Sequence, residues 1–322
     1  MTNPAPIAPT LDEIRAASKR LAPYTVRTPL LRLNIDDRAN EIYLKLENLQ
    51  AIGVFKVRSM GNAMLSADEE TLRDGVYTAS SGNAGIGLAW MANILGVKAT
   101  VYAPESGPAG KLLTMEEFGA TIQIMPDDDW WQIIQNAGHR EDPGFYVDAV
   151  RSPTALAGNA TMGLEIIEQL PDVDSIIVPF GGGGVACGIA SAVRSLKPGT
   201  SIIVAESETA APVTAALKAG LPVTVKTQPS FISGAGAPSV LEEMWPLIQN
   251  MVDATIVRPA AEVADAVRVL FERNRVVVEG AGALPVAAAL SDKTATGKTV
   301  CVVTGGNIDV DIMVKILLGQ PV

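Results

Sequence analysis

Short apolar segments rich in β-branched residues alternate with longer segments of helical period along most of the chain. The apolar segments have the length and composition of strands. The strands that we expect are residues 41–47, 75–80, 98–104, 120–125, 175–180, 201–207, 254–259 and 298–305. Between them, residues 83–96, 163–170 and 261–274 carry apolar residues at helical spacing. This alternation predicts an α/β fold in which parallel sheets are covered by helices on both faces.

Three of the expected strands run into loops that combine glycine with Ser, Thr or Asn. Their sequences are TASSGNAGIG at 78–87, VPFGGGGVACG at 178–188 and VVTGGNID at 302–309. Each loop taken alone could be a tight turn between a strand and a helix. Ligands of open α/β sheets bind at the carboxyl ends of the strands. Together, the three loops predict one polar site assembled from several strand ends.

The glycines of residues 181–184 favour a phosphate-binding loop, for which two interpretations compete. Glycine lets backbone N–H groups approach an anion, and a helix N-terminus adds a favourable dipole. Gly181, Gly183 and Ala186 match the G-x-G-x-x-A pattern of dinucleotide sites, with Glu206 at the end of the next strand. Four consecutive glycines instead favour a compact cup for a single phosphate. A nicotinamide-dependent oxidoreductase and a non-catalytic binding protein are therefore alternatives to consider.

Lys56 is the candidate for covalent chemistry. It follows an apolar turn in LENLQAIGVFKVRSMGNAML and is expected to open a helix. Desolvation and the helix dipole both disfavour an ammonium there and lower the lysine pKa. A lysine with a lowered pKa suits imine formation. The alternative is a solvated lysine at a helix start.

Composition narrows the chemistry further. The chain has 322 residues and a formal charge of −10, which argues against a nucleic-acid partner. The single histidine, His139, excludes a zinc site built on several histidines and lies in a polar loop where it is a poor catalytic base. Cys187 and Cys301 are interpreted as buried, reduced thiols of a cytoplasmic protein. We expect no membrane-spanning segment and no signal peptide.

Two helix starts are also expected from local patterns. Thr10 and Glu13 have the spacing of a capping box, and PDDDWW at 126–131 is expected to be a solvated, Asp-capped helix start.

Five motifs, in order along the chain, resemble those of a known family. They are LENLQAIGVFKVRSMGNA, SSGNAGIGLA, VPFGGGG, EGAGA and VVTGGN, within a resemblance that runs from about residue 10 to 320. The family is that of the fold-type II pyridoxal phosphate enzymes, and within it the threonine/serine dehydratases and serine racemases. The resemblance implies a tryptophan synthase β-like homodimer with two doubly wound parallel-sheet domains and the site between them. The large domain would comprise residues 1–50 and 150–322, and the small one residues 51–149.

The resemblance also implies which residues hold the cofactor, pyridoxal 5'-phosphate. Lys56 would bind it covalently as an imine, with Phe55 packed beside the ring. Asn83 would hydrogen-bond its phenolic oxygen, and Thr304 would lie at the pyridine nitrogen. The cofactor phosphate would be held by Gly181, Gly182, Gly183 and Gly184.

The substrate implied is a small amino acid. Ser80, Ser81 and Gly82 would receive its carboxylate, and Ser81 matches the serine that racemases use as acid and base on the face opposite the lysine. Glu279 in EGAGA belongs to a family motif near the ring, but it could simply cap a turn.

The reaction that the resemblance implies is deamination of a β-hydroxy amino acid such as L-threonine or L-serine, giving a 2-oxo acid and ammonia. An amino-acid racemase and a β-replacement enzyme of the same family are the alternatives.

The chain departs from the family pattern at several positions. Val54 and Ser59 replace a Ser and a Gly around the lysine, Ala84 replaces a His, and VDAVRS at 147–152 replaces H-P-F-D-D.

A divalent cation site of the kind found in serine racemases is incomplete in this sequence. Glu206 and Ala210 match that site, but Pro212 stands where an Asp is expected. We therefore predict no metal, with Glu208 as the alternative carboxylate.

Overall fold

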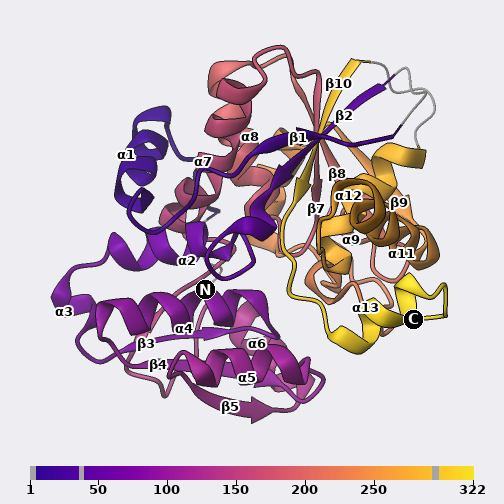
Figure 1. Cartoon of the computed structure of the whole chain (residues 1–322). Coiled ribbons are helices and arrows are strands. Elements are labelled where there is room, and N and C mark those ends of the chain that lie inside the picture. Colours follow the sequence, from indigo (N-terminus) through magenta and orange to yellow (C-terminus); the bar gives the residue numbers. More distant parts are fainter. Residues whose placement is uncertain (1–4, 36–39, 292–296) are drawn as a thin grey trace.

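Two sheets, each flanked by helices, make up the protein, as Figure 1 shows for the whole chain. The computed structural model describes residues 5–35, 40–291 and 297–322. The six-stranded sheet has the order β1-β2-β10-β7-β8-β9, and the four-stranded sheet has the order β5-β4-β3-β6. The strands are β1 (Leu30–Arg32), β2 (Asn40–Leu46), β3 (Val76–Ala79), β4 (Ala99–Pro104), β5 (Thr121–Met125), β6 (Phe145–Tyr146), β7 (Ser175–Pro179), β8 (Ser201–Ser207), β9 (Ala254–Arg258) and β10 (Gly297–Val303).

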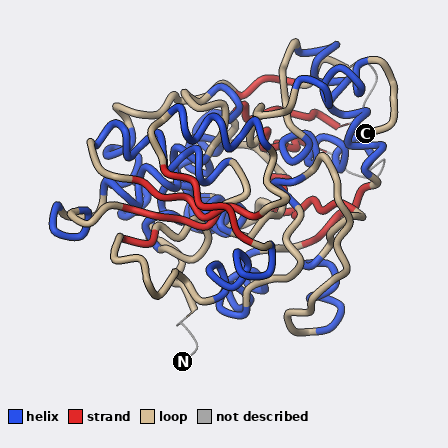
Figure 2. The backbone as a smooth tube through the Cα atoms, turned by 90° about the horizontal axis from the view of Figure 1, so that it is seen from below, coloured by secondary structure: helices blue, strands red, loops and turns tan. Residues whose placement is uncertain are grey.

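Helices cover both faces of each sheet, and the tube in Figure 2 shows the strands running side by side between them. The α-helices are α1 (Leu11–Leu21), α2 (Lys56–Leu65), α3 (Glu69–Leu72), α4 (Asn83–Leu95), α5 (Ala109–Glu117), α6 (Asp127–Gln135), α7 (Pro153–Gln169), α8 (Gly184–Leu196), α9 (Pro212–Ala219), α10 (Trp245–Met251), α11 (Ala260–Val269), α12 (Gly280–Ser291) and α13 (Val310–Leu317). Single-turn helices lie at Glu47–Leu49 (η1), Ser233–Ala235 and Glu242–Met244, and a π-helix at Leu270–Asn274 continues α11. Below, residues 76–146 are called the four-stranded unit; β1, β2 and the chain after residue 152 are called the six-stranded unit.

The sequence prediction of an α/β fold with parallel sheets is confirmed. All eight expected strands are present, and every strand pair is parallel except β1 with β2. The strands β1 and β6 were not expected, because segments of three and two residues are too short to show a pattern. The expected helix at 163–170 is the second half of the longer α7.

Of the two helix caps predicted from the sequence, the one at α1 is present and the one at α6 is not. Thr10 and Glu13 form the capping box of α1, with Thr10 N donating to Glu13 Oε2 at 2.7 Å. The expectation that an aspartate caps α6 is wrong. Pro126 is the N-cap of α6 and makes no side-chain cap bond, while the three aspartates occupy the first turn. They stabilise the helix through its dipole instead.

Small residues bring the buried helices close together. A Cβ added at Gly158 of α7 would stand 2.1 Å from the carbonyl oxygen of Arg58 in α2. A Cβ at Gly163 would stand 2.6 Å from the carbonyl oxygen of Ile189 in α8. The backbone of α2 is therefore packed directly against α7, and α7 against α8. This fixes the start of α2, where Lys56 lies, relative to the six-stranded unit.

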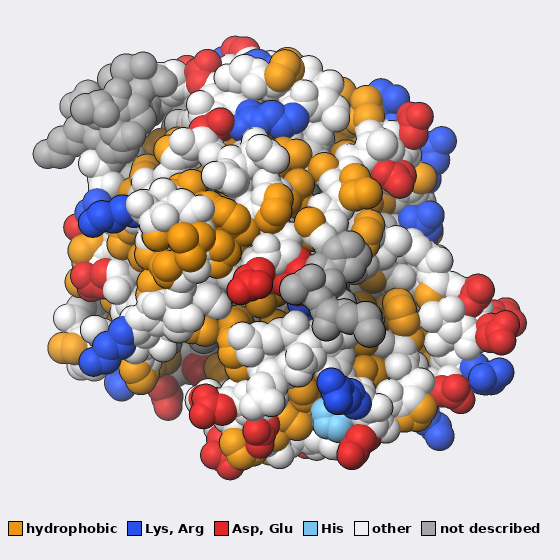
Figure 3. Space-filling model, turned by 180° about the vertical axis from the view of Figure 1, so that it is seen from behind, with side chains coloured by type: hydrophobic (Ala, Val, Ile, Leu, Met, Phe, Trp, Pro, Cys, Tyr) orange, Lys and Arg blue, Asp and Glu red, His pale blue; other side chains and the backbone are white. Residues whose placement is uncertain are grey.

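The surface carries both signs of charge. On the face in Figure 3, the Lys and Arg side chains stand singly or in small groups among Asp and Glu. Within the described residues, the structure contains no helix both long and apolar enough to cross a bilayer. Cys187 and Cys301 are buried free cysteines, as expected.

Candidate active site

Lys56 is the first residue of α2, as the sequence predicts, and is partly buried. Burial lowers the pKa of Lys56 to about 8, and the nearby carboxylate of Asp148 opposes that shift. Its Nζ lies 4.9 Å from the centroid of the Phe55 ring. In the part of the chain that the structure describes, this amine makes no hydrogen bond or ion pair. Lys56 is therefore a partly buried amine that gives up its proton far more readily than an exposed lysine and is free to react.

The segment before Lys56 is bound to the loop that follows β10. Phe55 N donates to the Thr304 carbonyl at 2.9 Å, and Gly306 N donates to the Gly53 carbonyl at 2.8 Å. Gly53 has a φ of +70°, a conformation that glycine adopts readily. Thr304 is buried, with 2% of its surface exposed. These bonds place Thr304 and Phe55 together beside Lys56.

The glycine loop, residues 181–184, links β7 to the start of α8. Added Cβ atoms would stand 2.8 Å from Gly234 O at Gly181, 2.7 Å from Val150 Cγ2 at Gly182, and 3.0 Å from Ala149 O at Gly184. Gly183 has a φ of +93°. Among the described residues, none of these four N–H groups has an acceptor. The loop is thus a backbone cup with unpaired donors at a helix N-terminus, which is the geometry of an anion site.

The serine loop, Ser80 to Gly82, links β3 to α4. Ser80 Oγ accepts a hydrogen bond from Gly82 N at 3.1 Å, and Ser81 is partly buried. One turn into α4, a Cβ added at Gly87 would stand 3.2 Å from Lys56 Cβ. The N-terminal part of α4 therefore packs against Lys56, so the serine loop lies on the same side of the molecule as the lysine.

Asn83, the first residue of α4, meets two side chains from the six-stranded unit. Its Nδ2 donates to Glu279 Oε1 at 2.5 Å, and its Oδ1 accepts from Asn307 Nδ2 at 3.1 Å. The other Glu279 oxygen, Oε2, accepts from Lys111 Nζ at 2.7 Å. Glu279 therefore does more than cap a turn. The sequence analysis did not include Lys111 or Asn307, because neither stands in a recognisable chemical pattern.

The segment at 147–152 forms the boundary between the two units. Asp148 Oδ2 accepts from Arg151 Nε at 2.7 Å, and Arg151 also donates to the backbone carbonyls of Ile134 and Gln135 at the end of α6. Because Val150 contacts Gly182 and the Asp148 charge acts on Lys56, this segment belongs to the site. The sequence identified it only as a departure from a family pattern.

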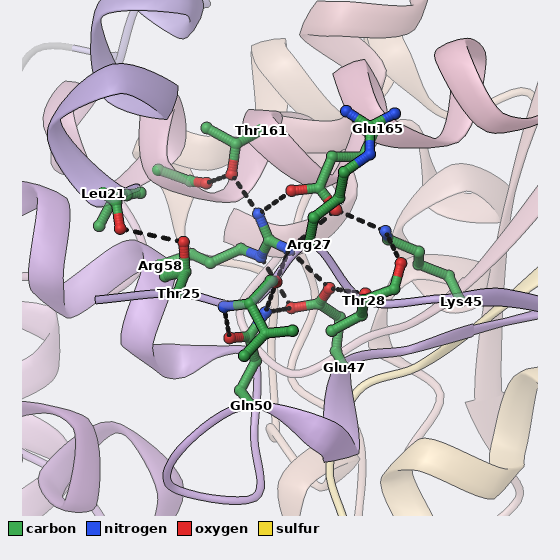
Figure 4. A network of polar contacts seen from close by, with 12 residues as sticks. Leu21, Thr25, Arg27, Thr28, Lys45, Glu47, Gln50, Arg58, Thr161 and Glu165 are labelled. Carbon is green, nitrogen blue, oxygen red and sulfur yellow. Dashed lines mark hydrogen bonds and ion pairs between the residues drawn. The ribbon is translucent and has the colours of Figure 1, made fainter. Parts of the chain in front are cut away.

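Behind Lys56, four buried charges form a network, drawn in Figure 4. Arg58 Nε donates to Glu47 Oε2 at 2.8 Å, and Arg58 Nη1 donates to Glu165 Oε1 at 2.7 Å. Lys45 Nζ donates to Glu165 Oε2 at 2.5 Å. Burial lowers the pKa of Lys45, and Glu165 opposes that shift. Two cations and two carboxylates balance, so this network, here called the Arg58 cluster, anchors α2 two residues beyond Lys56.

The residues of the incomplete cation site have other partners. Glu206 Oε1 accepts from Val213 N at 2.7 Å, and Oε2 accepts from Thr214 N at 2.9 Å and from Thr214 Oγ1 at 2.6 Å. Glu206 thereby binds the first turn of α9, and burial raises its pKa. Ala210 pairs with Ser207 in an isolated bridge. No group of three or more His, Cys, Asp or Glu residues that could hold a metal ion occurs in the described ranges.

Comparison with known proteins agrees with this geometry. Residues 21–305 match the family described as pyridoxal-phosphate dependent enzyme. An L-threonine ammonia-lyase of Geobacter sulfurreducens is 38% identical over 92% of this chain and 75% of its own length.

Two solved structures share the fold. A maize serine racemase has a TM-score of 0.89 at 30% identity, covering 97% of this chain and 98% of that one. A serine racemase from Dictyostelium discoideum has a TM-score of 0.82 at 30% identity, covering 94% of this chain and 100% of that one.

Proposed function

The chain belongs to the family of pyridoxal-phosphate dependent enzymes, and we propose that it is an ammonia-lyase that deaminates L-threonine or a related β-hydroxy amino acid. The observation that carries the proposal is the amine of Lys56, which is buried, has a pKa lowered to about 8 and is free of any ion pair among the described residues. The family match favours pyridoxal phosphate over a dinucleotide as the cofactor. Glu206, the acidic residue of the dinucleotide pattern, instead has both carboxylate oxygens hydrogen-bonded to the first turn of α9.

The residues present fit pyridoxal phosphate. The cup at residues 181–184 leaves four N–H groups without acceptors among the described residues and has no room for side chains, as a phosphate site requires. A reactive amine stands at the start of α2, with the Phe55 ring beside it. Lys56 would hold the cofactor covalently, the four glycines its phosphate, Asn83 its phenolic oxygen and Thr304 its ring nitrogen.

When bound, the cofactor supplies an aldehyde that condenses with amines and a ring that draws electrons from the substrate Cα. Lys56 would accept the proton from the substrate Cα, because its pKa of about 8 is close to the working pH. The hydroxyls of Ser80 and Ser81 and the backbone N–H of Ser81 would orient the substrate carboxylate; the backbone N–H of Ser80 is bonded to the Tyr102 carbonyl. The Thr304 hydroxyl adds no charge at the ring nitrogen.

In the complete reaction, threonine loses water across Cα and Cβ and takes up water as the amino group leaves. One L-threonine therefore yields one 2-oxobutanoate and one ammonia. The Geobacter relative is named for this activity. Ala84 and residues 147–152 depart from the family pattern, so the size of the side chain that the site accepts is to be measured with a series of β-hydroxy amino acids.

The test is to incubate the purified protein with pyridoxal phosphate and L-threonine and to measure both products. We expect equal amounts of 2-oxobutanoate and ammonia from L-threonine, pyruvate from L-serine, and no product with Lys56→Ala. Equal inactivity of the wild-type protein and Lys56→Ala toward all β-hydroxy amino acids would overturn the proposal.

A second candidate is racemisation, favoured by the similarity to maize serine racemase and by Ser81 in the serine loop. Racemisation needs an acid on the face opposite Lys56, whereas elimination does not. Ser81→Ala should therefore abolish any racemisation and leave deamination. Substrate recovered from deuterated water and separated on a chiral column distinguishes the two. Rapid conversion of L-serine to D-serine with negligible pyruvate would favour the racemase.

The finer features of the proposal concern organisation. We place the domain boundaries at residues 50 and 150, expect a homodimer located in the cytoplasm, and expect no metal requirement. Light scattering on a size-exclusion column tests the dimer, and activity after treatment with EDTA tests the metal.

A further inference from the structure

Lys111 joins the two units of the protein across the site. It lies in the first turn of α5, in the four-stranded unit, whereas Glu279 directly precedes α12 in the six-stranded unit. Their ion pair at 2.7 Å is buried, with 7% of Lys111 and 5% of Glu279 exposed. Among the ion pairs that the described residues form, it is the one that connects residues 76–146 to the remainder of the chain.

The same contact passes directly over the serine loop. A Cβ added at Gly82 would stand 2.6 Å from Lys111 Cδ, so the lysine stem lies against this glycine. One residue before Lys111, a Cβ at Gly110 would stand 2.9 Å from Asp309 Oδ1 in the six-stranded unit. The first turn of α5 therefore meets the six-stranded unit at two points, and only one of them is an ion pair.

Glu279 connects Lys111 to Asn83, because each of its two carboxylate oxygens binds one of them. Its Oε2 binds Lys111 and its Oε1 binds Asn83 Nδ2 at 2.5 Å. Asn307 binds the opposite end of the same carboxamide and also the carbonyl of Ile52, at 3.1 and 3.2 Å. With both ends bonded, the Asn83 side chain has a fixed orientation. That orientation depends on the position of Glu279, and so on Lys111.

We propose that the Lys111–Glu279 pair is a latch that holds the four-stranded unit closed over the site and positions Asn83. Lys111 is thus a positioning residue. The part that concerns Asn83 rests on the proposed function, whereas closure of the two units does not. When the pair breaks, water reaches both charges, the units separate at the serine loop, and Asn83 loses its fixed orientation.

The latch has consequences that can be separated from general stability. Lys111→Met removes the cation, and Glu279→Gln removes the charge but keeps an oxygen for Asn83. If the two residues act through each other, the double variant is no worse than Lys111→Met, because the second change has nothing left to break. Lys98→Met, which replaces an exposed lysine of the same unit, is the matched control.

The closing experiment measures amide hydrogen exchange in the cofactor-free protein together with KM and kcat in the holoenzyme. Lys111→Met should speed exchange at residues 80–83 and 109–117 and raise KM for L-threonine by about tenfold with a smaller change in kcat, because the closed state is less populated. The double variant should match it, and Lys98→Met should match wild type.

Additive effects of the two substitutions, or exchange at residues 80–83 unchanged in Lys111→Met and in Glu279→Gln, would overturn the latch. Coupled exchange in a protein that does not deaminate threonine would support the latch and reject the proposed function. Deamination of threonine without a coupled change in exchange at residues 80–83 would support the proposed function and reject the latch.

Discussion

The Arg58 cluster and the Lys111–Glu279 pair are both buried charge networks next to the site, but they are built differently. Arg58 is 1% exposed and bonds to two carboxylates, which also bind Lys45, Thr28 and Gln50. Among the described residues, Lys111 has one ionic partner, and that partner lies in the other unit. The cluster ties α2 to η1 and α7, and the backbones of α2 and α7 pack directly against each other.

This difference means that the Arg58 cluster is a fixed part of the folded core, whereas the Lys111–Glu279 pair is a contact that can open. Four balancing charges with several hydrogen bonds each cannot be hydrated without unfolding the region around α2. A single pair between two units can be hydrated by a local opening that leaves both cores intact. We therefore expect the first network to govern stability and the second to govern how the site closes.

Breaking the cluster at its centre should have the largest effect on stability. Arg58→Met leaves Glu47 and Glu165 buried with one remaining cation, so the free energy of unfolding should fall by about 3–5 kcal/mol. Urea unfolding of the cofactor-free protein measures this. The matched control is Arg27→Met, which removes an exposed pair with Glu168 and should cost at most about 1 kcal/mol. Equal losses in the two variants would contradict the comparison.

Removing one carboxylate from the cluster should have a smaller and pH-dependent effect. Burial alone would raise the pKa of Glu47, but Arg58, Lys45 and Thr28 together outweigh burial and hold the pKa below its ordinary value of 4.5. The stability that the ionised Glu47 provides is therefore present above pH 4.5 and is lost as the pH falls below that value. Glu47→Gln should cost about 2 kcal/mol at pH 7. The difference from wild type in unfolding free energy should narrow in acid; a constant difference would argue against this account.

The latch variant should lose less stability than either cluster variant. For Lys111→Met we expect about 1 kcal/mol, because Glu279 becomes hydrated when the units open and is not left buried without a partner. The same urea titration measures it, and exchange at residues 80–83 supplies the local signal. A loss as large as that of Arg58→Met would mean that the pair belongs to the core.

Removing the unpaired amine should cost no stability at all. The pKa of Lys56 is lowered by burial to about 8 from 10.5, so its protonation disfavours the folded state below pH 8, and this effect disappears as the pH rises toward 10.5. Cofactor-free Lys56→Met should match or exceed the stability of wild type at pH 7, with an advantage that shrinks at alkaline pH. Unfolding at the two pH values tests the sign.

The sequence predicted the fold more fully than the site. All eight strands that the β-α alternation predicted are present, because each of them carries its own local pattern; β1 and β6 were too short to show one. The serine and glycine loops and Lys56 also carry local patterns. Lys111 and Glu279 are 168 residues apart, and their contact exists only once two units are packed together. The Arg58 cluster could not be predicted either, because its residues are far apart in the sequence and nothing local indicates that a charged residue will be buried.

Three lysines of the described structure are wholly or partly buried near the site, and this sets the most direct test of the account. Lys45 and Lys111 are held in ion pairs, whereas Lys56 forms none with any residue that the structure describes. The measurement is borohydride reduction of the protein loaded with pyridoxal phosphate, followed by peptide mapping. We predict loss of the visible absorption band and a single pyridoxyl group, on Lys56. A pyridoxyl group on Lys45, Lys111 or any other lysine, or a protein that binds no cofactor, would contradict the central claim.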